Sequence, residues 1–206
     1  MVMPSMLQSV NSTFCRFTSS NLTLLRLISL NVLPVKFVSR NCELLRLAFS
    51  TSSSAATLPV TMECVEENLG VDKKITSFVL PIGATVNMDG TCLYQAVAVV
   101  FLAQLHMIDL TLGQQLTIVL TATLASIGSA AVPSAGLVML IIVLESVGLN
   151  PAWIAIIFPV DRILDMFRTV VNVTGDAVVC TIIADGEGML NYNPQENPSE
   201  TFDLDS

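Results

Sequence analysis

The amino-acid sequence predicts an all-α membrane protein, and three observations support this fold class. Of the 206 residues, 52% are hydrophobic and only 13% are charged, with a mean hydropathy of +0.70, whereas soluble domains carry about 25% charged residues. No residue from Leu110 to Leu144 carries a formal charge. Finally, the apolar segment around residues 81–91, PIGATVNMDGT, is long enough to cross a membrane and yet contains polar residues and two glycines.

The uncharged run predicts a helical hairpin. As one straight helix it would be about 52 Å long, against a hydrocarbon core of about 30 Å. Its middle, SIGSAAVPSAG at residues 126–136, contains glycines and a proline that interrupt a helix. Each flank is then too short to span. We therefore expect hairpin 2, at about 110–147, to enter and leave the membrane by one face, with a tip covered by protein.

A second tip of this kind is expected in the serine-rich STSSSAATLPVT, residues 50–61, which places hairpin 1 at about 44–71. The two tips share a weak similarity, SAATLP against SAAVP, and each is followed by a related pentad, NMDGT or NVTGD. Paired interrupted hydrophobic segments in corresponding positions point to the binding site of a transporter.

The segment between the hairpins, at about 76–105, is expected to be a transmembrane helix that is unwound at NMDG. Gly83 and Gly90 flank the polar centre, which suits an irregular turn. A carboxylate at this depth costs several kcal/mol unless it is compensated. Because unwound carbonyls and half-helix ends coordinate cations in membranes, we expect a cation to compensate Asp89.

The last helix, at about 152–184, is expected to span the membrane and carries a polar face within an arc of about 100°. This face consists of Asp161, Asp165, Arg168, Thr169, Asn172 and Asp176. A solvated surface helix of a soluble protein is the alternative, but the flanking IAIIFPV and AVVCTII leave almost no other polarity. Three carboxylates around one arginine need further positive charge, which sodium and a ligand ammonium group would supply. Pro159 is a position at which this helix could kink.

Several functional classes are excluded by composition. No basic stripe indicates nucleic-acid binding. The five cysteines include no CxxC pair, which argues against a disulfide framework or a zinc site. His106 has no His or Cys nearby and is interpreted as an interfacial residue. A serine hydrolase is disfavoured because no GxSxG is present, so we expect no enzyme activity.

Four stretches together resemble the glutamate and neutral amino acid transporter family, the sodium:dicarboxylate symporters: STSSSAATLPVT, LPIGATVNMDGT, TLASIGSAAVP and DRILDMFRTVVNVTGD. The resemblance covers about 44–188. It implies the C-terminal, transport-domain half of an inverted-repeat transporter, with hairpin 2 as the gate. The implied activity is sodium-coupled symport of aspartate or glutamate across a plasma or cell membrane, the mitochondrial inner membrane being the alternative.

The resemblance also implies substrate-binding residues: Ser54, Thr91, Val132, Asp165, Arg168, Thr169 and Asn172. Ser54 with its backbone would hold the α-carboxylate together with Val132. Thr91 and Asn172 would hydrogen-bond the ligand.

Specificity would rest on Arg168, because family members for neutral substrates lack arginine there. Asp165 would take the ammonium group, and Arg168 would pair with a side-chain carboxylate, for which a planar guanidinium is suited. Asp161 would help to orient Arg168. The alternative is a structural ion pair of Arg168 with Asp165 or Asp161. Dicarboxylates without an amino group remain open, although Asp165 would then face an anion.

Sodium ions are the implied cosubstrate, held at Gly83, Thr85, Asn87, Asp89, Ser126, Ile127, Ser129, Asn172 and Asp176. One set combines backbone carbonyls with the Asp176 carboxylate, and a second uses Asp89 with the Asn87 side chain. A third consists of carbonyls from Thr85 and the second tip, and forms only when that tip closes. Ion binding and ligand binding would thus be coupled.

Three departures from the family pattern are present. Ala131 and Ser134 stand where glycine is common in the second tip. Family members are roughly twice as long and form homotrimers through a scaffold, which residues 1–43 do not match. That segment is Arg- and Ser-rich, which is typical of a transit peptide; the alternative is that it is a gene-model artefact.

The alternative to a symporter is a truncated, non-transporting fragment that binds ligand or associates with full-length transporters. Residues 189–206 are expected to be a disordered acidic tail.

Overall fold

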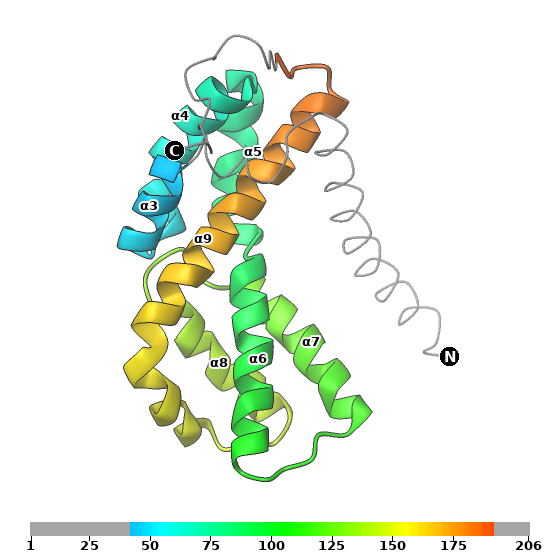
Figure 1. Ribbon diagram of the computed structural model, residues 1–206. Helices are drawn as coiled ribbons and strands as arrows, with labels where there is room; N and C mark the ends of the chain where they lie inside the picture. Colours follow the sequence, from blue (N-terminus) through cyan, green and yellow to red (C-terminus); the bar gives the residue numbers. More distant parts are fainter. Residues whose placement is uncertain (1–41, 192–206) are drawn as a thin grey trace, which may run out of the picture. The chain divides into compact units, whose positions relative to one another are not determined.

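The computed structural model describes residues 42–191 (Figure 1). Most of the expected non-family segment 1–43, and the tail from residue 192 onward, lie outside the described residues. Contacts divide the chain into Met1–Cys42 and Glu43–Ser206, and the candidate site residues all lie in the second unit.

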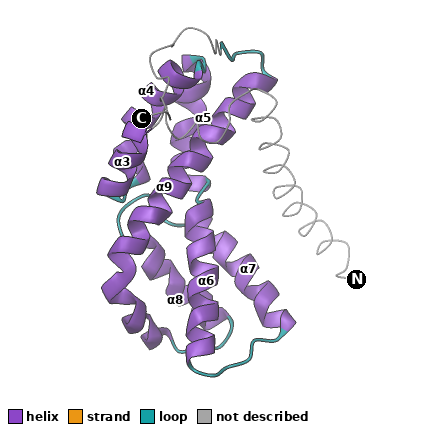
Figure 2. Cartoon of the chain, viewed as in Figure 1, coloured by secondary structure: helices purple, strands orange, loops and turns teal. Residues whose placement is uncertain are grey.

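The described residues are helical, which confirms the predicted all-α class, and they contain one isolated β-bridge but no strand (Figure 2). The helices in chain order are α3 (Cys42–Thr51), α4 (Ser54–Leu69), α5 (Lys73–Val86), α6 (Asp89–Leu105), α7 (Leu112–Ile127), α8 (Ala135–Ser146), the short 3₁₀ helix η1 (Pro151–Trp153) and α9 (Ile154–Gly186).

Helix α9 organises the fold because it packs against α4, α5, α6 and α8. Its 33 residues correspond to about 50 Å. In Figure 1, α3, α4 and α5 lie along one half of α9, while α6, α7 and α8 lie along the other. Helix α9 continues through Pro159 without a break. One long helix therefore faces both groups of shorter helices.

The expected broken span is divided between α5 and α6, which are interrupted at Asn87 and Met88. Asn87 ends α5, and its N–H donates to the carbonyl of Gly83 at 2.8 Å. Taken together, Lys73–Leu105 is the one helical stretch in residues 42–191 that is long and apolar enough to cross a membrane.

Two short connections face each other in the middle of the unit. Ser52 and Ser53 join α3 to α4, and residues 128–134, here called the second tip, join α7 to α8. The Ser53 hydroxyl donates to the carbonyl of Ala131 at 2.7 Å. The tips of the two helix pairs therefore touch, although they are far apart in sequence.

The end of α9 is attached to the loop between α4 and α5. Asp72 N–H donates to the Met189 carbonyl at 3.1 Å, and Asn191 N–H donates to the Gly70 carbonyl at 2.8 Å. Met189 and Asn191, which lie at the start of the expected tail 189–206, are therefore bonded to backbone groups of this loop.

Candidate functional site

The polar face of α9 is turned inward. The six residues that define it are each between 2% and 5% exposed: Asp161, Asp165, Arg168, Thr169, Asn172 and Asp176. The opposite face exposes large apolar side chains such as Ile163 and Phe167. A solvated surface helix would have the reverse arrangement, so this alternative does not hold for α9.

One cavity lies between the two tips and α9. It is lined by Ser52, Ser54, Met88, Thr91, Ser129, Ala130, Ala131, Val132, Gly136, Asp165, Arg168, Thr169 and Asn172. All seven residues that the sequence implied in substrate binding are among them. The cavity volume is about 20 Å³, enough for about one water molecule. An amino acid would need the surrounding groups to move apart.

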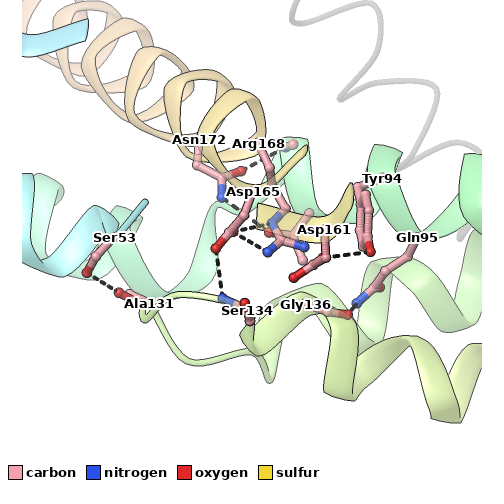
Figure 3. A network of polar contacts seen from close by, with 12 residues as sticks. Ser53, Tyr94, Gln95, Ala131, Ser134, Gly136, Asp161, Asp165, Arg168 and Asn172 are labelled. Carbon is pink, nitrogen blue, oxygen red and sulfur yellow. Dashed lines mark hydrogen bonds and ion pairs between the residues drawn. The ribbon is translucent and has the colours of Figure 1, made fainter. Parts of the chain in front are cut away.

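An ion pair occupies the wall of this cavity. Arg168 Nε donates to Asp165 Oδ1 at 3.0 Å, and Arg168 Nη2 donates to the same oxygen (Figure 3). The third guanidinium nitrogen, Nη1, is buried without a hydrogen-bond partner. Of the two partners that the sequence left open for Arg168, the structure pairs it with Asp165. A buried donor without a partner costs free energy, so Nη1 is available to a ligand.

Asp161 reaches Arg168 through an aromatic ring. The Tyr94 hydroxyl donates to Asp161 Oδ1 at 2.9 Å, and the Arg168 guanidinium carbon lies 4.6 Å from the centroid of the Tyr94 ring. This geometry is a cation–π contact. Sequence reasoning did not include Tyr94, although it lies one helical turn after Thr91 and so shares its face of α6.

Gln95 is a second residue that sequence reasoning missed. Its side chain is fully buried, and its Nε2 donates to the carbonyl of Gly136 at 3.3 Å, while its Oε1 has no partner. A Cβ at Gly136 would overlap the Arg168 guanidinium. Gly136 thus lets α8 approach Arg168 closely. A buried amide and a glycine within apolar helices were the available signals.

Asn172 connects α9 to the start of α6. Its Oδ1 accepts a hydrogen bond from Gly90 N–H at 2.8 Å, and its Nδ2 donates to Thr91 Oγ1 at 3.2 Å. Both polar atoms of the side chain are therefore engaged within the protein. Hydrogen bonding of this side chain to a ligand, as expected from the sequence, would require an exchange of partners.

The residues expected to bind sodium lie partly together. Asn87 Nδ2 donates to Asp176 Oδ1 at 3.0 Å, and a Cβ at Gly83 would lie 2.7 Å from the same oxygen. A Cβ at Gly175 would lie 3.3 Å from Asn87 Nδ2 and 3.4 Å from Asp89 Oδ2. These contacts bring Gly83, Asn87, Asp89 and Asp176 of the first two predicted sets to the break between α5 and α6.

The residues of the third set differ in exposure. Ser126 and Ser129 are buried near the end of α7, whereas Thr85 and Ile127 are exposed. In residues 42–191, no group of three or more His, Cys, Asp or Glu side chains is arranged to hold a metal ion. A site made mainly from backbone carbonyls does not need such a group.

Comparison with known proteins places these residues in a family. The model of the sodium:dicarboxylate symporter family matches residues 11–185, which include most of the segment expected to lie outside the family similarity. Excitatory amino acid transporter 3 from Homo sapiens is 58% identical over 144 residues, 70% of this chain and 28% of that protein.

Two further relatives agree. An excitatory amino acid transporter from Caenorhabditis elegans is 57% identical over 136 residues, 66% of this chain and 27% of that protein. Excitatory amino acid transporter 4 from Mus musculus is 53% identical over 150 residues, 73% and 27% of the two chains. The match thus spans less than a third of the length of these curated relatives. With most of its length matched by the family model, this chain belongs to the sodium:dicarboxylate symporter family.

Proposed function

We propose that this chain carries the substrate site of a sodium-coupled symporter for aspartate or glutamate, with the second tip as its gate. The observation that carries the proposal is the buried Arg168–Asp165 pair in the wall of the cavity between the tips. The relatives named excitatory amino acid transporters support the same substrate class. The membrane setting follows from family membership and from the apolar stretch Lys73–Leu105.

The substrate class follows from the charges that a ligand must replace. Separating a buried ion pair leaves two uncompensated charges, which is strongly unfavourable. A ligand with a side-chain carboxylate and an ammonium group satisfies Arg168 and Asp165 together. A dicarboxylate without an amino group leaves Asp165 facing an anion, and a neutral amino acid leaves Arg168 unpaired. The unpartnered Nη1 of Arg168 provides a further donor for bidentate pairing with a carboxylate.

The α-carboxylate of the ligand is proposed to bind at the start of α4. Ser52 Oγ is buried there without a hydrogen-bond partner, and both Ser52 and Ser54 line the cavity. The N-terminus of a helix favours negative charge because its N–H groups point outward. Val132, in the second tip, also lines the cavity, so movement of that tip would admit or enclose the ligand.

Sodium is proposed to bind beside the break between α5 and α6. The carboxylate of Asp176 and the side chain of Asn87 already meet there, and the end of α5 supplies carbonyls, as in other interrupted membrane helices. Asp89 lies next to Gly175 and would contribute a second ion ligand. Through Asn172, these positions connect to Gly90 and Thr91 at the cavity.

Radiolabelled aspartate binding to the purified chain in detergent, with sodium titrated, tests this function. We expect saturable, sodium-dependent binding. The affinity for aspartate should fall at least tenfold in Arg168→Ala, because the ion pair between the ligand's side-chain carboxylate and the buried guanidinium is lost. Arg162→Ala is the matched control, since this arginine lies on the same helix but is exposed. Succinate, which lacks an amino group, should compete poorly. A folded chain that binds aspartate equally with and without Arg168 would contradict the proposal.

A further inference from the structure

Helix α8 begins without a cap of its own. Its N-cap residue, Ser134, has φ 61° and ψ 7° in the left-handed region, and its side chain makes no capping hydrogen bond. The first N–H groups of a helix have no partner inside the helix and need one elsewhere. Here the Ser134 N–H donates to Asp165 Oδ2 at 2.8 Å (Figure 3). The start of α8 is therefore capped by a carboxylate from α9.

The start of α6 is supported in the same way. Its N-cap residue, Met88, provides no capping side chain, and the Gly90 N–H donates to Asn172 Oδ1 at 2.8 Å. By contrast, α4, α5 and α7 are capped by the adjacent Ser53, Asp72 and Thr111. Helices α6 and α8 are thus capped from α9, whereas α4, which also begins beside the cavity, is capped by its own adjacent serine. Asp165 and Asn172 are two turns apart, and so lie on one face.

We propose that Asp165 is a positioning residue for the second tip, in addition to its proposed contact with the ligand ammonium group. Its two oxygens have separate tasks. Oδ2 holds the Ser134 N–H and with it the left-handed turn that ends the tip, while Oδ1 is held by Arg168. A serine persists in this backbone region only where its surroundings impose it, and the capping bond is such a constraint.

The role of this capping bond in gating rests on the proposed function. A ligand carboxylate that draws Arg168 away frees Oδ1 for the ligand ammonium group, while Oδ2 remains on the tip. One carboxylate can thus bind the ligand and keep the tip closed over it. The second tip is also held at the Ala131 carbonyl, which accepts hydrogen bonds from the Ser53 hydroxyl at 2.7 Å and from the Ala55 N–H at 3.5 Å.

Backbone ester substitution at position 134 tests the capping bond directly. The Ser134→Ala variant keeps the N–H, and the same position filled with lactic acid keeps the methyl group but replaces N–H by oxygen. We measure amide hydrogen exchange of residues 135–140 in the full chain, in detergent, without ligand or sodium. Loss of a helix cap is expected to speed exchange about fivefold in the ester relative to Ser134→Ala, with α7 unchanged.

Two controls make the outcome decisive. Lactic acid at Ala56, whose N–H is capped by Ser53, should speed exchange at the start of α4 and leave residues 135–140 unchanged. Asp165→Ala should reproduce the effect of the ester and add nothing to it, whereas Asp161→Ala, one turn earlier and bonded to Tyr94, should not. If Asp165→Ala fails to fold, the ester alone decides.

A change below about twofold at residues 135–140, or an equal acceleration in α7 and α8, would overturn the proposal. An additive effect of the ester and Asp165→Ala would also overturn it, because independent effects add. None of these measurements requires ligand. If aspartate fails to bind, the proposed function fails while the role of Asp165 at the tip still stands or falls on the exchange rates.

Discussion

At the scale of single residues, the site depends on glycines whose missing side chains leave room for polar side chains of α9. Gly83 leaves room for Asp176, Gly90 for Asn172 and Gly136 for Arg168. Each glycine lets a helix approach the polar face of α9 more closely than any other residue would. The glycines of the NMDG region were expected to serve an unwound turn, but close approach is the property that the contacts show.

Gly90→Ala is expected to destabilise the fold. The added Cβ would lie 2.5 Å from the Arg168 carbonyl and 3.0 Å from Asn172 Oδ1, and a backbone carbonyl within a helix cannot move aside cheaply. We expect a loss of about 2 kcal/mol of unfolding free energy, typical of overpacking, measured by thermal or denaturant unfolding in detergent. Gly113→Ala is the control, since nothing lies within 4 Å of its Cβ position, and it should be neutral or slightly stabilising.

At the scale of elements, the second tip explains why one of its two departures from the family pattern matters and the other does not. Among the described residues, positive φ outside glycine occurs at Ser52, Met107 and Ser134. Ser134 therefore occupies a conformation that favours glycine, whereas Ala131 does not and contributes its carbonyl to Ser53. The left-handed backbone therefore explains a preference for glycine at position 134 but not at position 131.

Ser134→Gly is expected to stabilise the second tip. Glycine removes the steric cost of the left-handed conformation and keeps the N–H that Asp165 accepts, although it also increases the entropy of the unfolded chain. The net gain should be about 0.5 kcal/mol, seen as slower amide exchange at the start of α8. Ala131→Gly, which relieves no positive φ, should instead be neutral or destabilising. Faster exchange in Ser134→Gly than in wild type would contradict this account.

At the scale of the whole molecule, α9 connects the two proposed binding regions. Asp165 and Arg168 contact the cavity, and Asp176 contacts the end of α5 two to three turns further along the same face. Asn172 lies between them and bonds the start of α6. Sodium binding at the break between α5 and α6 would therefore be coupled to ligand binding at the cavity through residues of one helix.

Asp176→Asn is expected to reduce stabilisation by sodium. Binding to the native state alone raises stability by about 2.7 kcal/mol when the ion is present at 100 times its dissociation constant. The thermal midpoint of the wild-type chain should therefore rise when potassium is exchanged for sodium at constant ionic strength, and the midpoint of Asp176→Asn should rise less. Glu145→Gln, an exposed carboxylate at the end of α8, should behave as wild type. An equal sodium response in Asp176→Asn would rule out this position as an ion ligand.

The sequence by itself determined the helices, their interruptions and the polar face. Glycine and hydroxyl residues in apolar runs lie at or beside the breaks, whereas Pro59, Pro81 and Pro159 lie inside helices. The helical period of α9 selects six residues that prove to be buried. Periodicity states which face a residue shares, but not what lies opposite. Only tertiary packing decided that Arg168 pairs with Asp165 while Asp161 bonds Tyr94. It also decided that α9 caps α6 and α8, because those contacts join residues that are distant in sequence and depend on how the helices approach one another.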